Sequence, residues 1–364
     1  MKINLIIRCY CLEFKVLKSE INIYFQYEKN TKTSKFLFLY LLQIVFMGKL
    51  INGEWVAKSI ITSNDHGDYE RLPRTFLDNI SNEHKIFRPE SGRYHLYVSY
   101  ACPWASRTLI YRNLKDLESH ISVSVVHPDM LEDGWVFNDS FPGATIDHLY
   151  HKKFLREIYL KADSNITTSV TVPILWDKET ETIVNNESSQ IIRLFNSEFN
   201  KLTNNYDNFY PEDKKEEIDK INNLIYENIN NGVYKSGFAV TQKAYDNAVT
   251  KLFETLDYLD EILGKSKYLV GKILTEADLR LIPTLLRFDA VYVTHFKCNI
   301  RRIIDYQNLS RYLQNMLEIP AIKKTLNLDH VKRHYYFSHV ELNPSRIIPK
   351  GPANLEFKKN HFKS

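Results

Sequence analysis

The stretch Tyr94–Arg112 (YHLYVSYACPWASRTLIYR) constrains this chain more than any other. Its first part, Tyr94–Ser99, alternates apolar and polar positions and is rich in aromatic and β-branched side chains, which predicts a strand. After Pro103 the apolar residues follow a helical spacing, and proline is favoured in the first turn of a helix. The sequence therefore predicts a strand that passes directly into a helix, with Cys102 at the junction.

A cysteine at such a junction is a candidate nucleophile. The free N–H groups and the positive dipole end of the helix would face the sulfur of Cys102, and Arg107 adds positive charge about one turn further on. Such surroundings lower the pKa of a thiol and supply thiolate at neutral pH. The alternative is a buried structural cysteine, the usual state of a free cysteine in a core. The strand–Cys-Pro–helix context favours the reactive cysteine.

One absence sharpens this expectation. A dithiol oxidoreductase would carry a second cysteine three residues after the first, but Ala105 occupies that position. Any disulfide formed at Cys102 must then be opened by an external thiol. We therefore expect monothiol exchange, with a small thiol such as glutathione as co-substrate.

Composition bounds the class of protein and its compartment. The chain has 364 residues, 44% hydrophobic and 25% charged, which suffices for about two domains. A net charge of +4, spread along the chain, does not indicate a nucleic-acid-binding surface. The four cysteines, Cys9, Cys11, Cys102 and Cys298, are too scattered for a disulfide framework and favour a reducing compartment. We expect a cytoplasmic protein.

The first 46 residues form a separate case. Residues 36–46 (FLFLYLLQIVF) are apolar and follow a basic segment, as in a signal peptide, but they are too few to span a bilayer. Gly48-Lys49 is a poor cleavage site. We expect Met47 to be the natural start, and residues 1–46 to be a disordered start-site artefact; a targeting leader is the alternative. No membrane association is expected.

Residues 47–200 are expected to form a thioredoxin-like α/β domain with an N-terminal wrap of loops. Ile121–His127 reads as a second strand after the helix, which gives a β-α-β unit typical of a parallel sheet. The elements expected next are strands at Val170–Trp176 and Thr182–Val184 and a helix that begins at Glu187. The polar, turn-rich residues that follow indicate a linker at 201–215.

Residues 216–330 are expected to form an all-helical domain. Thr275 and Asp278 form a variant of the capping box. The tail at 331–364 is rich in His, Tyr and Pro and is expected to be a coil. The segments that carry apolar residues at three- and four-residue steps are Asp213–Ile229, Gln242–Leu263, Thr275–Phe288 and Leu309–Leu317.

Three features of the first domain favour a peptide-like ligand. In a thioredoxin-like sheet, the residue before a cis proline, here Val172, offers its backbone N–H and C=O to such a ligand. Glu187 and Ser188, at a helix start, suit the ammonium and carboxylate groups of the γ-glutamyl end of glutathione. Trp135 lies in a polar insertion and suits a ligand wall. A packing turn, a helix cap and a core tryptophan are the structural alternatives.

Tyrosines mark the second domain. Tyr234 lies in a polar break of the helical pattern, where a phenol can exchange a proton with a phenolic ligand; a surface turn explains the pattern equally well. The same two interpretations, a phenol that exchanges a proton with a ligand and a tyrosine without such a role, apply to Tyr292 and Tyr335. His330 and His334 stand four residues apart, but no third ligand accompanies them, so we predict no metal site. Cys298 is expected to be structural.

These residues resemble a known family, the glutathionyl-hydroquinone reductases, which form the Xi class of omega-like glutathione transferases. The resemblance runs from about residue 47 to residue 352, and its NGVY and HFKCN segments are specific to this class. The segments that carry it are ACPWA (101–105), SVVHP (124–128), TVPILWD (171–177), NNESS (185–189), NGVYKSGFA (231–239), LTEAD (274–278), RFDAVYV (287–293), HFKCN (295–299) and IPKGP (348–352).

The resemblance implies a glutathione transferase fold, a homodimer and the reduction of glutathionyl-hydroquinones to hydroquinones, with release of glutathione disulfide. By position, Cys102 would attack the glutathionyl sulfur and form a mixed disulfide, which a second glutathione would open. Tyr234 would donate or accept the proton at the leaving group, and Tyr292 and Tyr335 would assist the thiolate and the bound quinol. The implied glutathione-binding residues are Trp135, Ser169, Val170, Thr171, Val172, Glu187 and Ser188.

The chain departs from the family pattern at four positions. Ser106 replaces a histidine, Ser169 an arginine, Asn79 a tryptophan and Gln307 a proline; loss of the arginine is expected to weaken glutathione binding, and loss of the proline to be neutral. The rival activity is a general omega-type thioltransferase or dehydroascorbate reductase, which shares the cysteine but does not need the tyrosines. A non-catalytic glutathione- or quinone-binding protein would instead have an inert Cys102. The cysteine argues against ordinary conjugation, which uses serine or tyrosine to activate glutathione.

Overall fold

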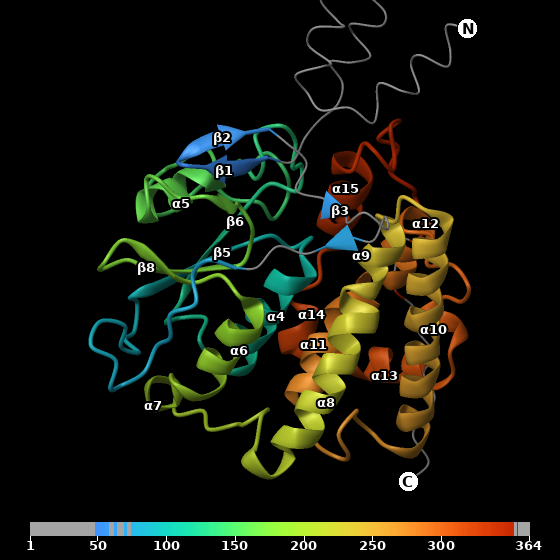
Figure 1. The fold of residues 1–364 in the computed structure, drawn as a ribbon. Helices are drawn as coiled ribbons and strands as arrows, with labels where there is room; N and C mark the ends of the chain where they lie inside the picture. Colours follow the sequence, from blue (N-terminus) through green and yellow to red (C-terminus); the bar gives the residue numbers. More distant parts are fainter. Residues whose placement is uncertain (1–47, 58–61, 64–68, 71–73, 353–354, 356–364) are drawn as a thin grey trace, which may run out of the picture. The chain divides into compact units, whose positions relative to one another are not determined.

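A computed structural model describes residues 48–57, 62–63, 69–70, 74–352 and 355 of the chain (Figure 1). The expected leader at 1–46, with Cys9 and Cys11, lies outside these residues, as does the expected start at Met47. No helix within the described ranges is both long enough and apolar enough to cross a membrane.

A four-stranded sheet organises the first half of the described chain, in the order β6-β5-β8-β9. Strand β5 lies parallel to β6 and antiparallel to β8, and β9 pairs antiparallel with β8. All residues of β5 are buried, as expected for a strand covered on both faces. The strands are β5 (Tyr94–Val98), β6 (Ser122–Val125), β8 (Ile174–Asp177) and β9 (Thr182–Asn185).

Helices complete the thioredoxin-like arrangement that the sequence predicted. Helix α4 (Pro103–Leu114) connects the parallel strands β5 and β6, and α6 (Ser188–Ser197) follows β9 and packs against α4 (Figure 1). The insertion between β6 and β8 holds α5 (Leu155–Ala162). The strand expected from Val170 begins only at Ile174. Proline lacks the N–H that a central strand needs, and Pro173 accordingly stands before the strand, after a cis peptide bond.

The N-terminal wrap, expected to be loops, contains short strands. Asn52 and Gly53 form the two-residue turn that joins β1 to β2, with φ values of 49° and 79°. A hairpin turn with positive φ at both positions favours the sequence Asn-Gly. Strand β1 also pairs with β7, and β3 pairs with β4. The bounds are β1 (Lys49–Ile51), β2 (Glu54–Val56), β3 (Thr62–Ser63), β4 (Tyr69–Glu70) and β7 (Thr168–Ser169).

The second half is helical, and each of the four predicted helical segments is present. Two π-helical turns, η2 and η3, follow directly on α8 and α11. The linker region contains α7 (Asn200–Thr203) and the 3-10 turn η1 (Glu212–Lys214). The remaining elements are α8 (Lys215–Ile225), η2 (Tyr226–Asn230), α9 (Gly232–Gly237), α10 (Gln242–Lys265), α11 (Glu276–Arg287), η3 (Phe288–Tyr292), α12 (Val293–His295), η4 (Ile303–Asp305), α13 (Asn308–Leu317), α14 (Pro320–Lys323) and α15 (Leu328–Ser338).

The coil expected at 331–364 is wrong for its first residues, because α15 continues to Ser338. The Asn327 side chain caps this helix by accepting a hydrogen bond from the backbone N–H of His330 at 3.0 Å. Most positions of this helix are buried, and His and Tyr occupy more of them than aliphatic residues do. The buried positions are His330, Val331, Lys332, His334, Tyr335, Tyr336 and Ser338.

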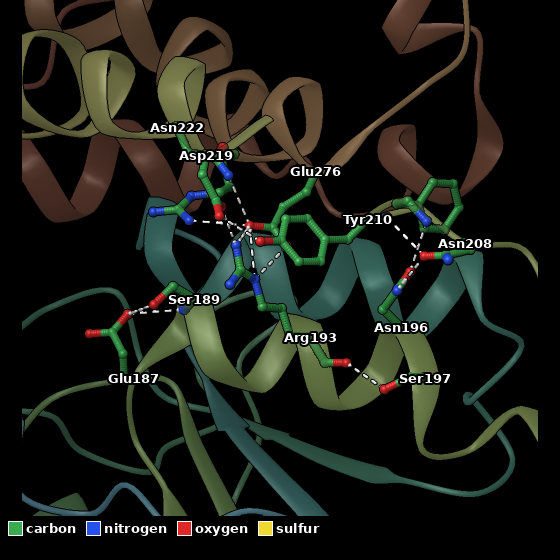
Figure 2. A network of polar contacts seen from close by, with 12 residues as sticks. Glu187, Ser189, Arg193, Asn196, Ser197, Asn208, Tyr210, Asp219, Asn222 and Glu276 are labelled. Carbon is green, nitrogen blue, oxygen red and sulfur yellow. Dashed lines mark hydrogen bonds and ion pairs between the residues drawn. The ribbon is translucent and has the colours of Figure 1, made fainter. Parts of the chain in front are cut away.

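An ion-pair network joins the two halves (Figure 2). Arg193 of α6 contacts Glu276 of α11 at 3.0 Å and Asp219 of α8 at 2.7 Å. Glu276 is fully buried and also accepts hydrogen bonds from Asn222 and Arg280. Just before Glu276, the predicted capping box of Thr275 and Asp278 is present, which confirms the expected start of α11. The domain boundaries at 200 and 216 remain predictions.

Candidate active site

Cys102 stands at the predicted junction between strand and helix. It is half-buried, and α4 begins at the next residue, so the N-terminal end of the helix meets the cysteine. Its Sγ lies 3.6 Å from the carbonyl oxygen of Val172. The fold therefore brings the cysteine beside the residue that precedes the cis proline, 70 positions later in the chain.

Tyr159 of α5 fixes the backbone beside the cysteine. Its hydroxyl donates to the carbonyl oxygen of Thr171 at 2.9 Å and accepts from the N–H of Thr171 at 3.3 Å. The same hydroxyl accepts from the side-chain amide of Asn186 at 3.2 Å. Tyr159 thus links the segment before Pro173 to the segment before α6. Sequence reasoning missed this residue, because a tyrosine in an amphipathic helix gives no signal beyond burial.

Glu187 and Ser188 lie at the N-terminus of α6. A carboxylate oxygen of Glu187 accepts hydrogen bonds from the N–H and the hydroxyl of Ser189, both at 2.9 Å (Figure 2). Ser188 is buried, and its hydroxyl lies 3.5 Å from the same oxygen. The capping role is therefore present in the structure. Contact of these residues with glutathione stays a prediction.

Three tyrosines from three elements meet in one hydrogen-bonded group, here called the tyrosine trio: Tyr234, Tyr292 and Tyr335. The hydroxyl of Tyr335, on α15, lies 2.6 Å from that of Tyr234 and 3.1 Å from that of Tyr292. Tyr292 and Tyr335 are buried, whereas Tyr234 is half-buried. Tyr234 is therefore the member of the trio that is open to a ligand.

Burial keeps the two inner phenols protonated. It raises the pKa of Tyr292 to about 12 and the pKa of Tyr335 well above its usual value. A negative charge on Cys102 raises the pKa of Tyr292 further, so the sulfur and the trio lie within electrostatic range. At neutral pH both inner hydroxyls remain hydrogen-bond donors.

Helical irregularities and one glycine place the trio. Tyr292 ends η3, and Tyr234 lies in α9, directly after η2; single π-helical turns change the direction in which the following side chains point. The ring of Phe296 contacts all three tyrosines, with centroid distances of 5.4 to 5.7 Å. A Cβ on Gly237 would stand 2.3 Å from the Phe296 ring, so only glycine fits there.

Two arginines near Cys102 differ from the sequence-based expectation. Arg107, expected to add positive charge about one turn from the sulfur, donates to the Asn230 side chain at 2.8 Å and stacks over Trp104. Arg287, which sequence reasoning did not select, donates to the carbonyl oxygens of Tyr100 and Ala101, both at 2.8 Å. Its signal in the sequence was a cation directly after the mostly apolar run at 281–286.

Trp135, expected to form a ligand wall on a loop of the polar insertion, is buried. Its side chain is 6% exposed, and its ring stacks on His334 with centroids 4.7 Å apart. The loop turns inward because Gly134 has a φ of 71° and packs closely against the ring of Trp55. Contact of Trp135 with glutathione stays a prediction.

His330 and His334 each bind a backbone oxygen. Their ring nitrogens lie 2.9 Å from the carbonyl oxygens of Pro142 and Pro128. In the described part of the chain, no group of three or more His, Cys, Asp or Glu residues is arranged to hold a metal ion. Cys298 is buried, and burial raises its thiol pKa to about 12, which suits a structural residue.

A cavity of about 520 Å³ opens in the insertion, but neither Cys102 nor the tyrosine trio lines it. Its wall includes the Asp129–Arg333 ion pair, His127 and Phe141. We therefore do not assign the glutathione site to it.

Known proteins match most of the chain. Residues 101–198 match the family glutathione S-transferase, N-terminal domain, and residues 242–315 match glutathione S-transferase, C-terminal domain. The glutathionyl-hydroquinone reductase YqjG of Escherichia coli (strain K12) is 51% identical over 84% of this chain and 95% of its own length. The glutathionyl-hydroquinone reductase PcpF of Sphingobium chlorophenolicum is 48% identical over 84% of this chain and 97% of its own.

Solved structures agree. The crystal structure of the glutathione-S-transferase Xi from Phanerochaete chrysosporium is 50% identical, with a TM-score of 0.79 over 81% of this chain and 96% of that one. The chain belongs to the Xi-class glutathione transferases. A further Xi-class structure, ECM4 from Saccharomyces cerevisiae in complex with glutathione, is 38% identical, with a TM-score of 0.78 over 81% of this chain and 100% of that one.

The structure places three of the four residues that the sequence analysis contrasted with this family's pattern. Ser169 is half-buried at the end of β7, next to the buried Val170, and lies directly across the ladder from Lys49 of β1. Directly paired residues in an antiparallel ladder share one face, so a cation flanks the position where an arginine was expected. Ser106 is buried inside α4, and Asn79 is exposed.

Proposed function

We propose that this chain reduces glutathionyl-hydroquinones to hydroquinones, with glutathione as co-substrate and Cys102 as nucleophile. One observation carries the proposal: the helix-terminal cysteine, 3.6 Å from the Val172 carbonyl oxygen, lies within electrostatic range of a hydrogen-bonded tyrosine trio. The cysteine alone would serve any thiol exchange, whereas the trio suits a substrate that is itself a phenol. Relatives about half identical to this chain carry the name glutathionyl-hydroquinone reductase.

In the first step, the Cys102 thiolate attacks the glutathionyl sulfur of the substrate. A bond forms between the two sulfurs, and the bond between sulfur and ring carbon breaks. The electron pair of the broken bond stays on the ring carbon, which takes up a proton. Tyr234 supplies that proton because it is the half-buried member of the trio, and Tyr335, 2.6 Å behind it, donates a hydrogen bond to the resulting phenolate.

In the second step, the thiolate of a free glutathione attacks the mixed disulfide. Glutathione disulfide leaves, and the Cys102 thiolate is restored. Tyr234 regains its proton from the thiol that has become a thiolate, either directly or through water. Each turnover thus oxidises two glutathionyl sulfurs and reduces one ring carbon.

Glutathione is proposed to bind along the first domain. The backbone of Val172 pairs with its cysteinyl part, and Glu187 and Ser188 hold its γ-glutamyl end. Ser169, Val170, Thr171 and Trp135 complete the proposed site. Glutathione-bound structures of relatives that are 53% and 38% identical support glutathione as the ligand.

The second candidate is a general thioltransferase, which the accessible cysteine alone would support. A direct test compares two substrates, glutathionyl-menadiol and a small mixed disulfide of glutathione. We expect Cys102→Ser to abolish both reactions. We expect Tyr234→Phe to lower kcat on glutathionyl-menadiol by about 100-fold, the usual contribution of a general acid, and to spare disulfide exchange. Turnover by Cys102→Ser would overturn the proposal, and an equal loss on both substrates would favour the thioltransferase.

We further propose a homodimer in the cytoplasm, without nucleic-acid or membrane partners. The only cysteines among the described residues, Cys102 and Cys298, are free thiols, which suits a reducing compartment. Size-exclusion chromatography with light scattering tests the dimer.

A further inference from the structure

Arg287 is a buried cation that has no carboxylate partner among the described residues. It ends α11, and its side chain is almost completely buried. Its hydrogen bonds all go to backbone carbonyl oxygens. They join Nε to Ala101 and Nη2 to Tyr100, both at 2.8 Å, and Nη1 to Pro283 at 2.6 Å.

A neutral donor would have bonded these carbonyls at less cost, because burying an unpaired guanidinium loses a large hydration free energy. In another contact between the same two halves, Arg193 meets the carboxylates of Glu276 and Asp219. At Arg287 the charge is left uncompensated, so it remains available to a negative group that forms nearby.

The group that can become negative closest in sequence to these hydrogen bonds is the sulfur of Cys102. The two carbonyls that Arg287 binds belong to the two residues directly before the cysteine. The charge of Arg287 also acts on Tyr292 of η3 and on Tyr335 and His334 of α15. It opposes the increase that burial causes in the pKa of the two tyrosines, and it reinforces the decrease that burial causes in the pKa of His334.

Most other groups near the sulfur are uncharged. From the segment before Pro173 the sulfur meets a neutral carbonyl, and the trio presents protonated phenols. Burial keeps His334 neutral by lowering its pKa to about 4. Arg107 of α4 is a second buried cation, but it donates to the Asn230 side chain and the Arg280 carbonyl oxygen of the helical half, whereas Arg287 donates to the backbone directly before Cys102.

We propose that Arg287 is a positioning residue for the nucleophile: it holds the Tyr100–Ala101 turn so that Cys102 faces the tyrosine trio, and its buried charge stabilises the ionised sulfur. The proposal rests on the nucleophilic role of Cys102 proposed above, but not on the identity of the quinol. It also explains why a residue of the helical half bonds to the backbone that leads into α4.

The test measures the ionisation of Cys102 without any quinol substrate. The rate of iodoacetamide alkylation is followed against pH in the full-length chain, and mass spectrometry of the Cys102 peptide keeps Cys9 and Cys11 out of the signal. Arg287→Gln removes the charge. Arg287→Lys keeps the charge but loses the paired hydrogen bonds of the guanidinium to the carbonyl oxygens of Tyr100 and Ala101. Arg193→Gln is the matched control, because it breaks a contact between the same two halves away from Cys102.

We expect Arg287→Gln to raise the alkylation midpoint by about one pH unit, as for the loss of a nearby opposite charge. We expect Arg287→Lys to keep the midpoint near that of wild type and to lower kcat on glutathionyl-menadiol about tenfold, because the turn is held less firmly. Arg193→Gln should lower Tm and leave both the midpoint and kcat unchanged.

A wild-type midpoint in folded Arg287→Gln would overturn the proposal. If that variant does not fold, Arg287→Lys decides: wild-type kcat would overturn the positioning role, and a reduced kcat would support it. Failure of the proposed function has a different signature, namely a wild-type enzyme whose Cys102 ionises at low pH but which does not reduce glutathionyl-menadiol.

Discussion

At the scale of single residues, the site depends on side chains that position backbone. Tyr159 shows this for glutathione: one hydroxyl holds Thr171, just before the cis proline, and Asn186, just before the glutamate cap of α6. These two segments carry the main proposed glutathione contacts. The distance between them therefore depends on a residue that touches neither the thiol nor the quinol.

Tyr159→Phe is expected to raise KM for glutathione about five- to tenfold, the effect of losing hydrogen bonds that together contribute roughly 1–1.5 kcal/mol. The kcat should change little, because Cys102 and the tyrosine trio keep their places. Steady-state kinetics with varied glutathione gives both constants.

The matched control is Tyr94→Phe, which removes a buried hydroxyl bonded to the carbonyl oxygen of Arg88 in the same half. It should lower Tm and leave KM unchanged. An unchanged KM in Tyr159→Phe, with a Tm loss like that of Tyr94→Phe, would reduce Tyr159 to a structural residue.

At the scale of elements, α15 carries the centre of the tyrosine trio and contributes to a buried histidine cluster, in which His334 lies on α15, His339 directly follows it and His295 ends α12. Burial lowers the pKa of His295 and of His334 to about 4, and that of His339 well below its usual value. His295 and His339 share a hydrogen bond of 3.1 Å between their rings. The packing of α15 therefore requires neutral histidines.

This cluster predicts a loss of stability in mild acid. The folded pKa values lie below the usual value of 6.5, so between pH 6.5 and 4 the unfolded chain binds more protons than the folded chain. The contribution of the neutral histidines to the free energy of unfolding is fully present above pH 6.5. It falls as pH drops towards 4, by on the order of 3 kcal/mol for each such histidine. Urea unfolding at several pH values measures the slope.

His334→Gln should flatten that slope, and His151→Gln, at an exposed position, should leave it unchanged. A free energy of unfolding that stays constant from pH 7 to pH 5 in wild type would contradict the buried, neutral cluster.

The same helix shows where sequence reasoning is limited. The four long helices were predictable because aliphatic residues carried their period, and the thioredoxin-like order followed from alternation, Cys-Pro and Val-Pro. In α15, buried positions are occupied by residues such as His334, Tyr335 and Ser338. These residue types are common both on surfaces and in cores, so the sequence showed no clear apolar pattern and a coil was expected. The Asn52-Gly53 hairpin had a clear local signal that the polar composition of the wrap obscured.

At the site, local pattern predicted residues whose role depends on their own neighbours in sequence, such as Cys102 at a helix start. It did not predict partners that only the fold supplies. Arg287 bonds to the carbonyl oxygen of Ala101, 186 positions earlier in the chain, and Trp135 is buried against a histidine that the sequence places in the tail. The hydrogen-bond partner of Arg107 could not be predicted either, because helical spacing does not determine which neighbour a long cationic side chain contacts.

At the scale of the whole molecule, the proposed chemistry needs both halves at once. The thioredoxin-like half supplies the sulfur and the proposed glutathione contacts, and the helical half supplies the tyrosine trio. Several arginines join the halves, among them Arg193 with its carboxylates, seen in Figure 2, and Arg287 with the turn before Cys102. The contact of Arg193 is an ordinary ion pair between the two halves. The contact of Arg287 connects the helical half to the backbone that precedes the nucleophile.

The measurement that tests the central claim most directly is the mass of the intact chain after mixing with excess glutathionyl-menadiol and no free glutathione. The account predicts one glutathionyl group added at Cys102, one equivalent of menadiol released, and recovery of the original mass when glutathione is added. Release of menadiol from a chain that carries no glutathionyl group at Cys102, or full turnover by Cys102→Ser, would contradict it.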